Sequence, residues 1–231
     1  MGVHDAPQWL MSAFVRSVVE AGATAPPGEI REVGEALIAR WSSPERCYHN
    51  LRHLIDVLAH VDELAEETHE PDLVRLAAWY HGAKFDAAEA AAYANKGGED
   101  EPGSARLALE ELLGLGVPEA HARRVHELVL ALAHHHAQPG DFDGAVLCDA
   151  DLAMLAAAPQ RYKAYLQDLR AEYAHLPVED YLRARVAIIG RLLDRPQLFT
   201  SPLGAVWEEP ARQNLAAERQ RIDRELSALA H

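Results

Sequence analysis

The sequence predicts an all-α fold, arranged as a single domain over residues 1–231. Alanine and leucine are abundant and runs of β-branched residues are short, which favours helices over strands. Apolar residues recur at intervals of three and four between polar turns, the period of a helix with one buried face. No internal repeat and no sharp change of composition marks a domain boundary. Together these three observations favour one helical bundle over a sheet protein or a two-domain chain.

Turn residues divide the chain into the expected helices. The first is predicted to close near Gly22, ahead of Pro26 and Pro27. Residues 82–103 are the least regular stretch, and we expect either a long loop or a short helix over 87–94 followed by a turn; loops of this length often line functional sites. The expected helices lie near residues 7–21, 29–41, 50–67, 72–81, 104–115, 118–136, 151–157, 159–173, 178–193 and 210–229.

The composition and net charge of the chain limit the classes of partner that it is expected to bind. Hydrophobic residues make up 49% and charged residues 25% of the chain, as in ordinary globular proteins. The net charge of −14 argues against a nucleic-acid backbone or an anionic membrane as a partner, because each needs a basic face. No run approaches the ~18 apolar residues of a membrane span, and the N-terminus lacks the basic start of a signal peptide. Cys47 and Cys148 are expected to be free thiols, and a reducing cytoplasm is the expected location.

Three of the 13 histidines stand where a shared site can form. His49 and His53 are four residues apart, so both imidazoles would lie on one face if this stretch is helical. His81 ends a long apolar run and should emerge from a buried helix into an interior pocket. Partial desolvation makes an unpaired polar group costly at such a position.

The second half supplies further candidates. Residues 134–136 are three consecutive histidines after an apolar run, and Asp149 and Asp151 follow the apolar run 145–148. One divalent metal is an economical way to satisfy several such groups together. Ordinary structural roles are the alternatives: a surface or core histidine pair, a hydrogen-bonded core His81, a solvated helix end for the triple histidine, and a helix cap for either aspartate.

The order of these pieces resembles the HD superfamily, and most closely the bacterial group described as predicted metal-dependent HD phosphohydrolases. The stretch Tyr48-His49-Asn50, followed by His53, is also similar to the opening of the site in the more distant cyclic-nucleotide phosphodiesterases. The resemblance extends over nearly the whole chain, through residues 46–53, 79–81, 101–105, 148–152, 170–173 and 209–214.

The resemblance implies a role for each candidate. His49 would be the catalytic proton donor, His53 and His81 metal ligands, and Asp151 the closing carboxylate, chosen over Asp149 on the family's register alone. Four further residues are additional candidates for the site: His134, Asp149, Asp86 and Glu101. The chain departs from the family at Gly82, because His81-Gly82 stands where the family has His-Asp and the usual carboxylate ligand is missing.

The implied function is hydrolysis of a phosphate ester or anhydride in a small phosphorylated molecule or nucleotide. One divalent ion (Mn, Fe, Co, Ni, Zn or Mg) would polarise the phosphoryl group, unless the site has been lost. Arg46 or Arg52 is a candidate for holding a phosphate oxygen, with a surface salt bridge as the alternative. Two other functions remain open: a degenerate HD protein that binds a ligand or partner without turnover, and an HD-type oxygenase with two irons. On the sequence alone, Gly82→Asp is expected to raise metal affinity.

Overall fold

The computed structural model describes residues 6–86 and 98–229 of the 231-residue chain, and within these ranges the protein is all-α. The nearest approach to a sheet among them is one isolated bridge between Phe85 and Glu99. In the described part of the chain, no helix combines the length and the apolar character needed to cross a membrane. The α-helices are α1 (Gln8–Glu20), α2 (Pro27–Trp41), α3 (Leu51–Glu63), α4 (Pro71–Tyr80), α6 (Glu101–Gly114), α7 (Glu119–Ala131), α8 (Phe142–Leu152), α9 (Pro159–Glu172), α10 (Val178–Leu193) and α11 (Glu208–Leu229).

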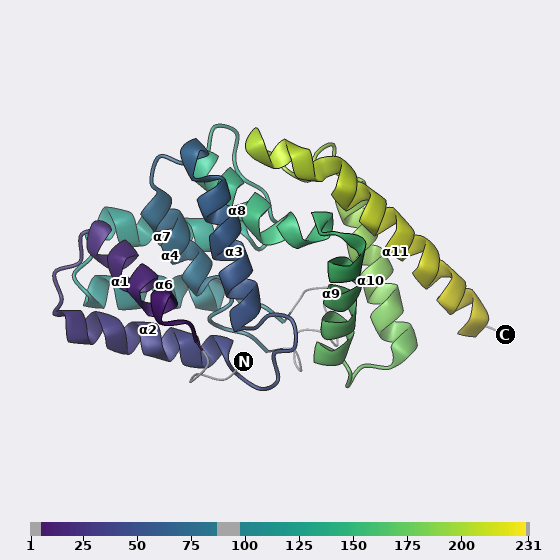
Figure 1. The fold of residues 1–231 in the computed structure, drawn as a ribbon, viewed down its shortest axis with the longest axis horizontal. Helices are drawn as coiled ribbons and strands as arrows, with labels where there is room; N and C mark the ends of the chain where they lie inside the picture. The colour runs from purple at the N-terminus through teal and green to yellow at the C-terminus, as the bar shows by residue number, and fades with distance from the viewer. Residues whose placement is uncertain (1–5, 87–97, 230–231) are drawn as a thin grey trace.

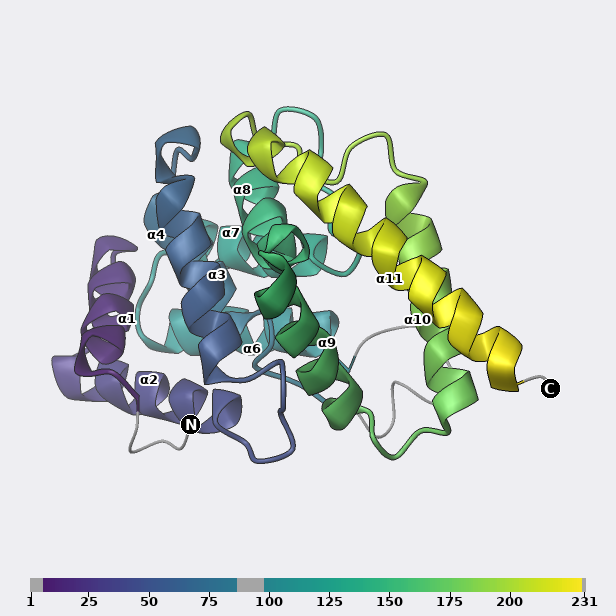
Figure 2. The same cartoon turned by 45° about the vertical axis from the view of Figure 1, so that its right-hand side comes forward.

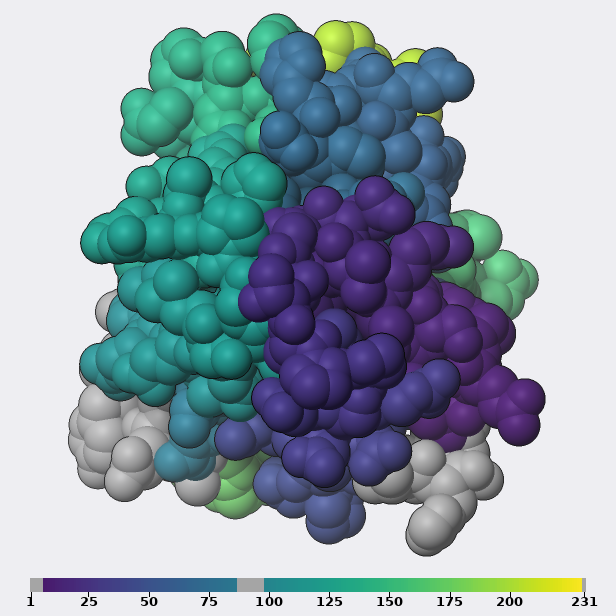
Figure 3. All heavy atoms as spheres, turned by 90° about the vertical axis from the view of Figure 1, so that its left-hand side faces the viewer, coloured from purple at the N-terminus to yellow at the C-terminus, as the bar shows by residue number. Residues whose placement is uncertain are grey.

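The helices gather around two apolar cores. Helices α1–α8 lie at one end of the molecule and α9–α11 at the other, with the long α11 running diagonally to the C-terminus (Figures 1 and 2). The first core is built on Phe14, Trp41 and Trp79, and the second on Tyr162 and Phe199, while the ring of Trp207 packs against both. Figure 3 shows α1 and α2 beside α6 and α7 on the outer wall of the first core.

The N-terminus of α3 is set by a side-chain cap. Asn50 Oδ1 accepts a hydrogen bond from the backbone N–H of Arg52 at 2.8 Å, and Asn50 Nδ2 donates to the carbonyl of Cys47 at 2.6 Å. Helix α3 therefore begins at Leu51, and His49 precedes it in the connection from α2. The stretch from His49 to His53 is therefore not helical throughout, so the condition for a shared helix face is not met, yet the two rings are neighbours, 5.5 Å apart between centroids.

Two predicted helices differ from the structure. The helix expected over 118–136 ends at Ala131, because the chain then turns, and His135 adopts a φ of 42°, which no right-handed helix accommodates. The helix expected over 151–157 instead begins at Phe142, ends at Leu152 and continues as a 3₁₀ turn. Its apolar run is buried on almost every side, so it shows no amphipathic period that sequence inspection can detect. The short helix that was the alternative over 87–94 lies outside the described residues, as do residues 87–97 of the loop expected over 82–103.

Asp143, in the first turn of α8, ties three elements together. Its Oδ1 accepts hydrogen bonds from Thr68 Oγ1 at 2.5 Å and from the backbone N–H of His69 at 3.0 Å, just ahead of α4. Its Oδ2 accepts from Arg124 Nη2 of α7 at 3.1 Å. Burial would raise the pKa of the carboxyl, but the bonds from Thr68 and Arg124 dominate and lower it. The anchor fixes α8, and with it the aspartates at the helix end.

We expect Asp143→Asn to lower the free energy of unfolding by about 1–3 kcal/mol near neutral pH, since it weakens buried charge-assisted hydrogen bonds. A carboxyl with a depressed folded-state pKa stabilises the fold above its unfolded pKa, near ~3.9, and ceases to do so as the pH falls through the folded value. The difference between the two proteins should therefore shrink below about pH 4. Urea unfolding from pH 3 to 7 measures it, with the exposed Asp223→Asn as control. A difference that does not change with pH would refute this assignment.

Candidate metal centre

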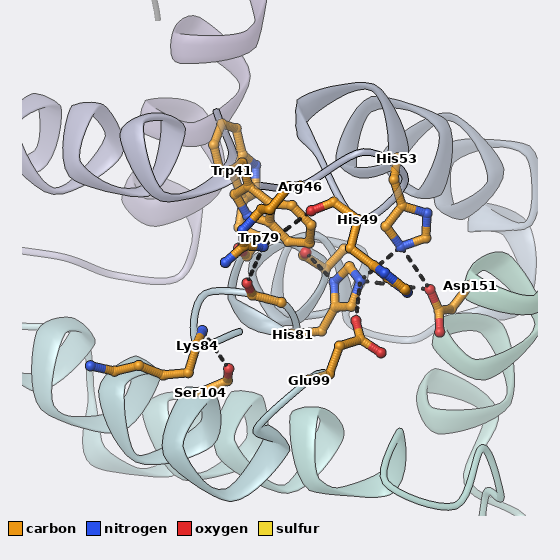
Figure 4. Close-up of polar contacts among 12 residues, drawn as sticks. Trp41, Arg46, His49, His53, Trp79, His81, Lys84, Glu99, Ser104 and Asp151 are labelled. Carbon is orange, nitrogen blue, oxygen red and sulfur yellow. Dashed lines mark hydrogen bonds and ion pairs between the residues drawn. The ribbon is translucent and has the colours of Figure 1, made fainter. Parts of the chain in front are cut away.

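Side chains from three helices meet at one point between α3, α4 and α8 (Figure 4). His53 comes from the first turn of α3, His81 caps the C-terminus of α4, and Asp151 lies in the last turn of α8. His53 Nε2 lies 3.2 Å from His81 Nε2 and 3.2 Å from Asp151 Oδ1, and His81 Nε2 lies 3.6 Å from the same oxygen. The structure thus brings together the three residues that the sequence predicts as ligands.

Glu99 joins this cluster and was not predicted. The residues that leave α4 pair with the residues that precede α6: the backbone N–H of Asp100 donates to the Lys84 carbonyl at 3.1 Å, alongside the Phe85–Glu99 bridge. This pairing places Glu99 Oε1 3.9 Å from His81 Nε2. His53, His81 and Glu99 each offer a donor atom within 4.8 Å of the others, an arrangement that fits a metal site. No residue spacing in the sequence predicts that Glu99 lies beside His81, because this contact depends on the single Phe85–Glu99 bridge.

The polar atoms of the cluster are poorly satisfied by hydrogen bonds alone. Glu99 Oε1 is buried and accepts no hydrogen bond from any described residue. One proton on His53 Nε2 can satisfy either His81 or Asp151, but not both. An unsatisfied buried acceptor costs on the order of 1–3 kcal/mol. A divalent cation would satisfy His53, His81 and Glu99 together, and Asp151 lies beside both imidazoles, so the residues present fit one ion.

The separations also fit an ion. A tetrahedral ion with bonds of ~2.0–2.1 Å holds its ligand atoms roughly 3.3–3.4 Å apart. The separations among His53, His81 and Asp151, at 3.2, 3.2 and 3.6 Å, lie near this value. Glu99 Oε1 lies farther out, 3.9 Å from His81 Nε2. His81 Nδ1 lies 2.6 Å from the Ala78 carbonyl, so it carries the proton and donates it there. Burial lowers the pKa of His81, which keeps the ring neutral and its Nε2 lone pair directed at the cluster.

Asp151 is held from its other side by His135. His135 Nε2 lies 2.7 Å from Asp151 Oδ2, and Arg195 holds the turn by donating to the carbonyls of His135 and His134, at 3.0 and 2.8 Å. Burial would raise the pKa of Asp151, but the hydrogen bonds from His135 and His53 lower it well below its ordinary value. His134, the candidate from sequence, is exposed instead. Because the backbone of His135 is left-handed, its ring points inward to Asp151. The choice of His134 went with a helix predicted to continue through residue 136, and α7 ends before this turn.

The other candidates lie elsewhere. Asp149 is fully buried, but its carboxylate accepts from the backbone N–H groups of Thr200 and Ser201, at 3.0 and 2.7 Å, and so anchors the chain before α11. Neither aspartate caps a helix that starts near residue 151, because α8 is capped by Asp141. Asp86 is exposed and Glu101 begins α6; the cluster described above contains Glu99 in place of either.

Gly82 is enclosed by Trp41. A Cβ added at Gly82 would lie 2.3 Å from Cη2 of the Trp41 indole, a ring that is fully buried and whose Nε1 donates to the Trp79 carbonyl at 2.9 Å. The Gly82 carbonyl accepts from Arg46 Nη1 at 2.7 Å. The position that carries Asp in the HD pattern therefore faces an aromatic ring here, and no side chain fits without displacing it.

His49 borders the cluster and pairs with Glu172 at the end of α9. His49 Nδ1 lies 2.5 Å from Glu172 Oε1, while the other carboxylate oxygen accepts from the backbone N–H groups of Tyr48 and His49, each at 3.0 Å. Burial alone would lower the pKa of His49, but the negative charges of Glu99 and Glu172 raise it. The ring is thus favoured as imidazolium, with its Nε2–H left for another acceptor because Nδ1 is engaged.

Both cysteines are free thiols. Cys148 is buried within α8, and burial raises the pKa of its thiol, as the nearby Asp151 and Asp149 also do. Cys47 lies one residue before Tyr48 and is half-buried. Neither thiol belongs to the cluster of donor atoms.

Comparison with known proteins adds no function to this geometry. No protein-family model matches the chain, and no curated protein matches it. The function therefore has to be inferred from the cluster of His53, His81, Glu99 and Asp151 and from the His49–Glu172 pair.

The contact with Trp41 reverses the expectation for Gly82→Asp. Because the added side chain must push aside a buried indole, we expect Gly82→Ala to lower the free energy of unfolding by about 1–3 kcal/mol, and Gly82→Asp to lower it further without raising metal affinity. Gly190→Ala on α10, where a Cβ meets nothing within 4 Å, is the matched control and should not destabilise the protein. Thermal unfolding and metal titration provide the measurements. A stable Gly82→Asp protein with tighter metal binding would contradict the structure.

Proposed function

We propose that the protein binds one divalent transition-metal ion through His53, His81, Asp151 and Glu99, and hydrolyses a phosphate ester or anhydride of a small molecule. The observation that carries the proposal is the buried meeting of two imidazoles and two carboxylates, in which Glu99 Oε1 has no hydrogen bond from the described residues. A donor set of two nitrogens and two oxygens suits Zn, Mn, Fe or Co better than Mg, which prefers oxygen ligands and water.

The chain's own residues supply a proton donor beside the cluster. An ion bound there would polarise a phosphoryl oxygen as a Lewis acid. His49, held through Nδ1 by Glu172, can hand its Nε2 proton to the leaving oxygen of a phosphate ester. Glu172 keeps the ring in one orientation and favours its charged form, so it acts as a positioning residue for His49.

Resemblance to the HD superfamily supports the same reaction class. His49, His53, His81 and Asp151 occur in the family's order, and Glu99 supplies a carboxylate from a different segment in place of the one missing at Gly82. Two-metal members use the Asp of the His-Asp pair as a bridge, and Trp41 fills the corresponding space here. This favours one ion over two, and a hydrolase over a two-iron oxygenase.

Metal analysis is the first test. We expect about one ion per chain by mass spectrometry of protein reconstituted with Mn, Fe(II), Co, Ni or Zn, and phosphatase activity in a screen of small phosphorylated molecules with the same metals. His81→Ala should abolish metal binding, and Glu99→Gln should weaken it at least ~10-fold, since even outer-shell contacts of metal ligands contribute that much. His136→Ala, an exposed neighbour of the cluster, is the control. Two tightly bound irons would favour the oxygenase, and no bound metal in any form would favour a binding protein.

The pH profile tests the His49–Glu172 pair. His49 donates a proton only when charged, so kcat/KM should fall as the pH rises through its raised pKa. Glu172→Gln removes a negative charge that raises this pKa, so the fall should move to lower pH, with metal content unchanged. His49→Asn should lower kcat by about 10²–10⁴-fold. Glu179→Gln on α10, which changes an exposed ion pair, should leave the profile in place. An unshifted profile in Glu172→Gln would exclude His49 as the titrating donor.

A further inference from the structure

A second cavity lies against the outer side of the His81–Gly82 turn. It is bounded by the C-terminal end of α2, the connection from α2 to α3 and residues 83–85, and its volume is about 380 Å³. Small-molecule sites typically occupy ~300–1,000 Å³. None of the residues of the metal cluster lines it, so it is a separate compartment. Its lining consists of Ala39, Arg40, Ser43, Glu45, Arg46, Ala83, Lys84 and Phe85.

Positive charge is concentrated in this cavity. Three basic side chains line it, Arg40, Arg46 and Lys84, against the single carboxylate of Glu45, in a chain whose net charge is −14. None of the three cations forms an ion pair within 4.0 Å among residues 6–86 and 98–229, whereas most other buried or half-buried arginines, such as Arg124 and Arg185, do. Glu45 is exposed and bonded to Ser43, which lowers the pKa of its carboxyl. Unpaired cations around a cavity of this size suit an anionic ligand.

Arg46 is the most informative of the three. It is 7% exposed, and its Nη1 donates to the carbonyls of His49 and Gly82 at 3.2 and 2.7 Å. Its guanidinium lies 4.8 Å from the centre of the Phe85 ring and 5.2 Å from that of Trp41. Burial lowers the pKa of Arg46 to about 10, although the acids Glu99 and Glu172 oppose this. A buried arginine without a bonded carboxylate is costly, and a bound anion would offset that cost.

The cavity is connected to the proposed catalytic residues through two shared side chains. Phe85 lies between them, its ring 5.2 Å from that of His49, and Arg46 holds the His49 carbonyl. In Figure 4, Arg46 and Lys84 lie on the side of the cluster away from Asp151. The sequence offered a surface salt bridge as the alternative role for Arg46. That alternative is wrong, because the Arg46 side chain is buried and contacts carbonyl groups and aromatic rings.

We propose that this cavity is an anion subsite in which Arg40, Arg46 and Lys84 hold a phosphoryl or carboxylate group. Two sources have the same chemistry: a second acidic group on the substrate that is hydrolysed at the metal centre, or a separate small anion. Binding of the anion here does not require the metal centre to be active, so the subsite and the proposed hydrolase function can fail independently.

Calorimetric titration with inorganic phosphate tests the subsite, using metal-free protein at constant ionic strength so that screening does not differ between samples. We expect saturable binding, weakened about tenfold in Lys84→Gln and in Arg40→Gln, since each removes a charge-assisted contact. Both side chains are half-buried and form no ion pair within 4.0 Å among the described residues, although the charges of both lower the pKa of Glu111 on α6, which burial raises. Lys163→Gln on α9, an exposed lysine, is the matched control and should bind phosphate like the unmodified protein. Absence of saturable binding, or equal affinity in all four proteins, would overturn the proposal.

Once an ester that the protein hydrolyses is known, a second experiment distinguishes the two origins of the anion: a second acidic group of the substrate, or a separate small molecule. KM is compared for a monophosphate ester and for the corresponding bisphosphate, in the unmodified protein and in Lys84→Gln. If the subsite holds the substrate's second acidic group, Lys84→Gln raises KM for the bisphosphate about tenfold and leaves the monophosphate unchanged. If it holds a separate anion, Lys84→Gln affects both substrates alike. Added inorganic phosphate then changes their turnover more in the unmodified protein than in Lys84→Gln, in which only product inhibition at the metal centre remains.

Discussion

The burial of the His53 and His81 imidazoles beside the carboxylates of Asp151 and Glu99 is the constraint on which the packing of α3, α4 and α8 depends. Such groups are tolerated in a core only when each is satisfied. Asp149 and Asp143 meet this demand with backbone N–H groups and an arginine, so they stabilise the fold. The polar atoms of the cluster around His81 are not all satisfied in this way, since Glu99 Oε1 is buried and accepts no hydrogen bond from the described residues. This difference distinguishes the buried acids that stabilise the fold from those that are proposed to bind a metal.

Trp41 explains how the site departs from the pattern that its sequence resembles. The indole is fixed by its bond to Trp79 and by the first core, so the backbone of Gly82 can pass against it only without a side chain. The carboxylate of Glu99, carried by the chain that returns to α6, lies beside His81 on another side. Under the proposed function, Glu99 would supply the carboxylate that is missing at Gly82. A comparison of single positions would overlook this, because the two residues belong to different segments of the chain.

The helical class and most helix positions could be predicted from the sequence, because they depend on local period. The grouping of His53, His81 and Asp151 was implied by the resemblance to the HD superfamily, and the structure places these three side chains together. Prediction from the sequence failed where structure depends on contacts between distant segments. The start of helix α8 was missed because the helix is buried on nearly all sides. His134 was chosen over His135 because nothing in three consecutive histidines indicates which of them has a left-handed backbone. Glu99 and Glu172 were missed because contacts between distant segments bring them to the site: the Phe85–Glu99 bridge in one case and the end of α9 in the other. Neither residue stands at a spacing in the sequence that predicts such a contact.

The two apolar cores have a consequence for how the site is assembled during folding. His53, His81 and Glu99 belong to elements packed on the first core, whereas Glu172, which orients His49, ends a helix packed on the second. A folding intermediate with only the first core formed would possess the donor atoms of the cluster but an unoriented His49. Under the proposed function, the proton donor would therefore be oriented only once α9 has packed into the second core.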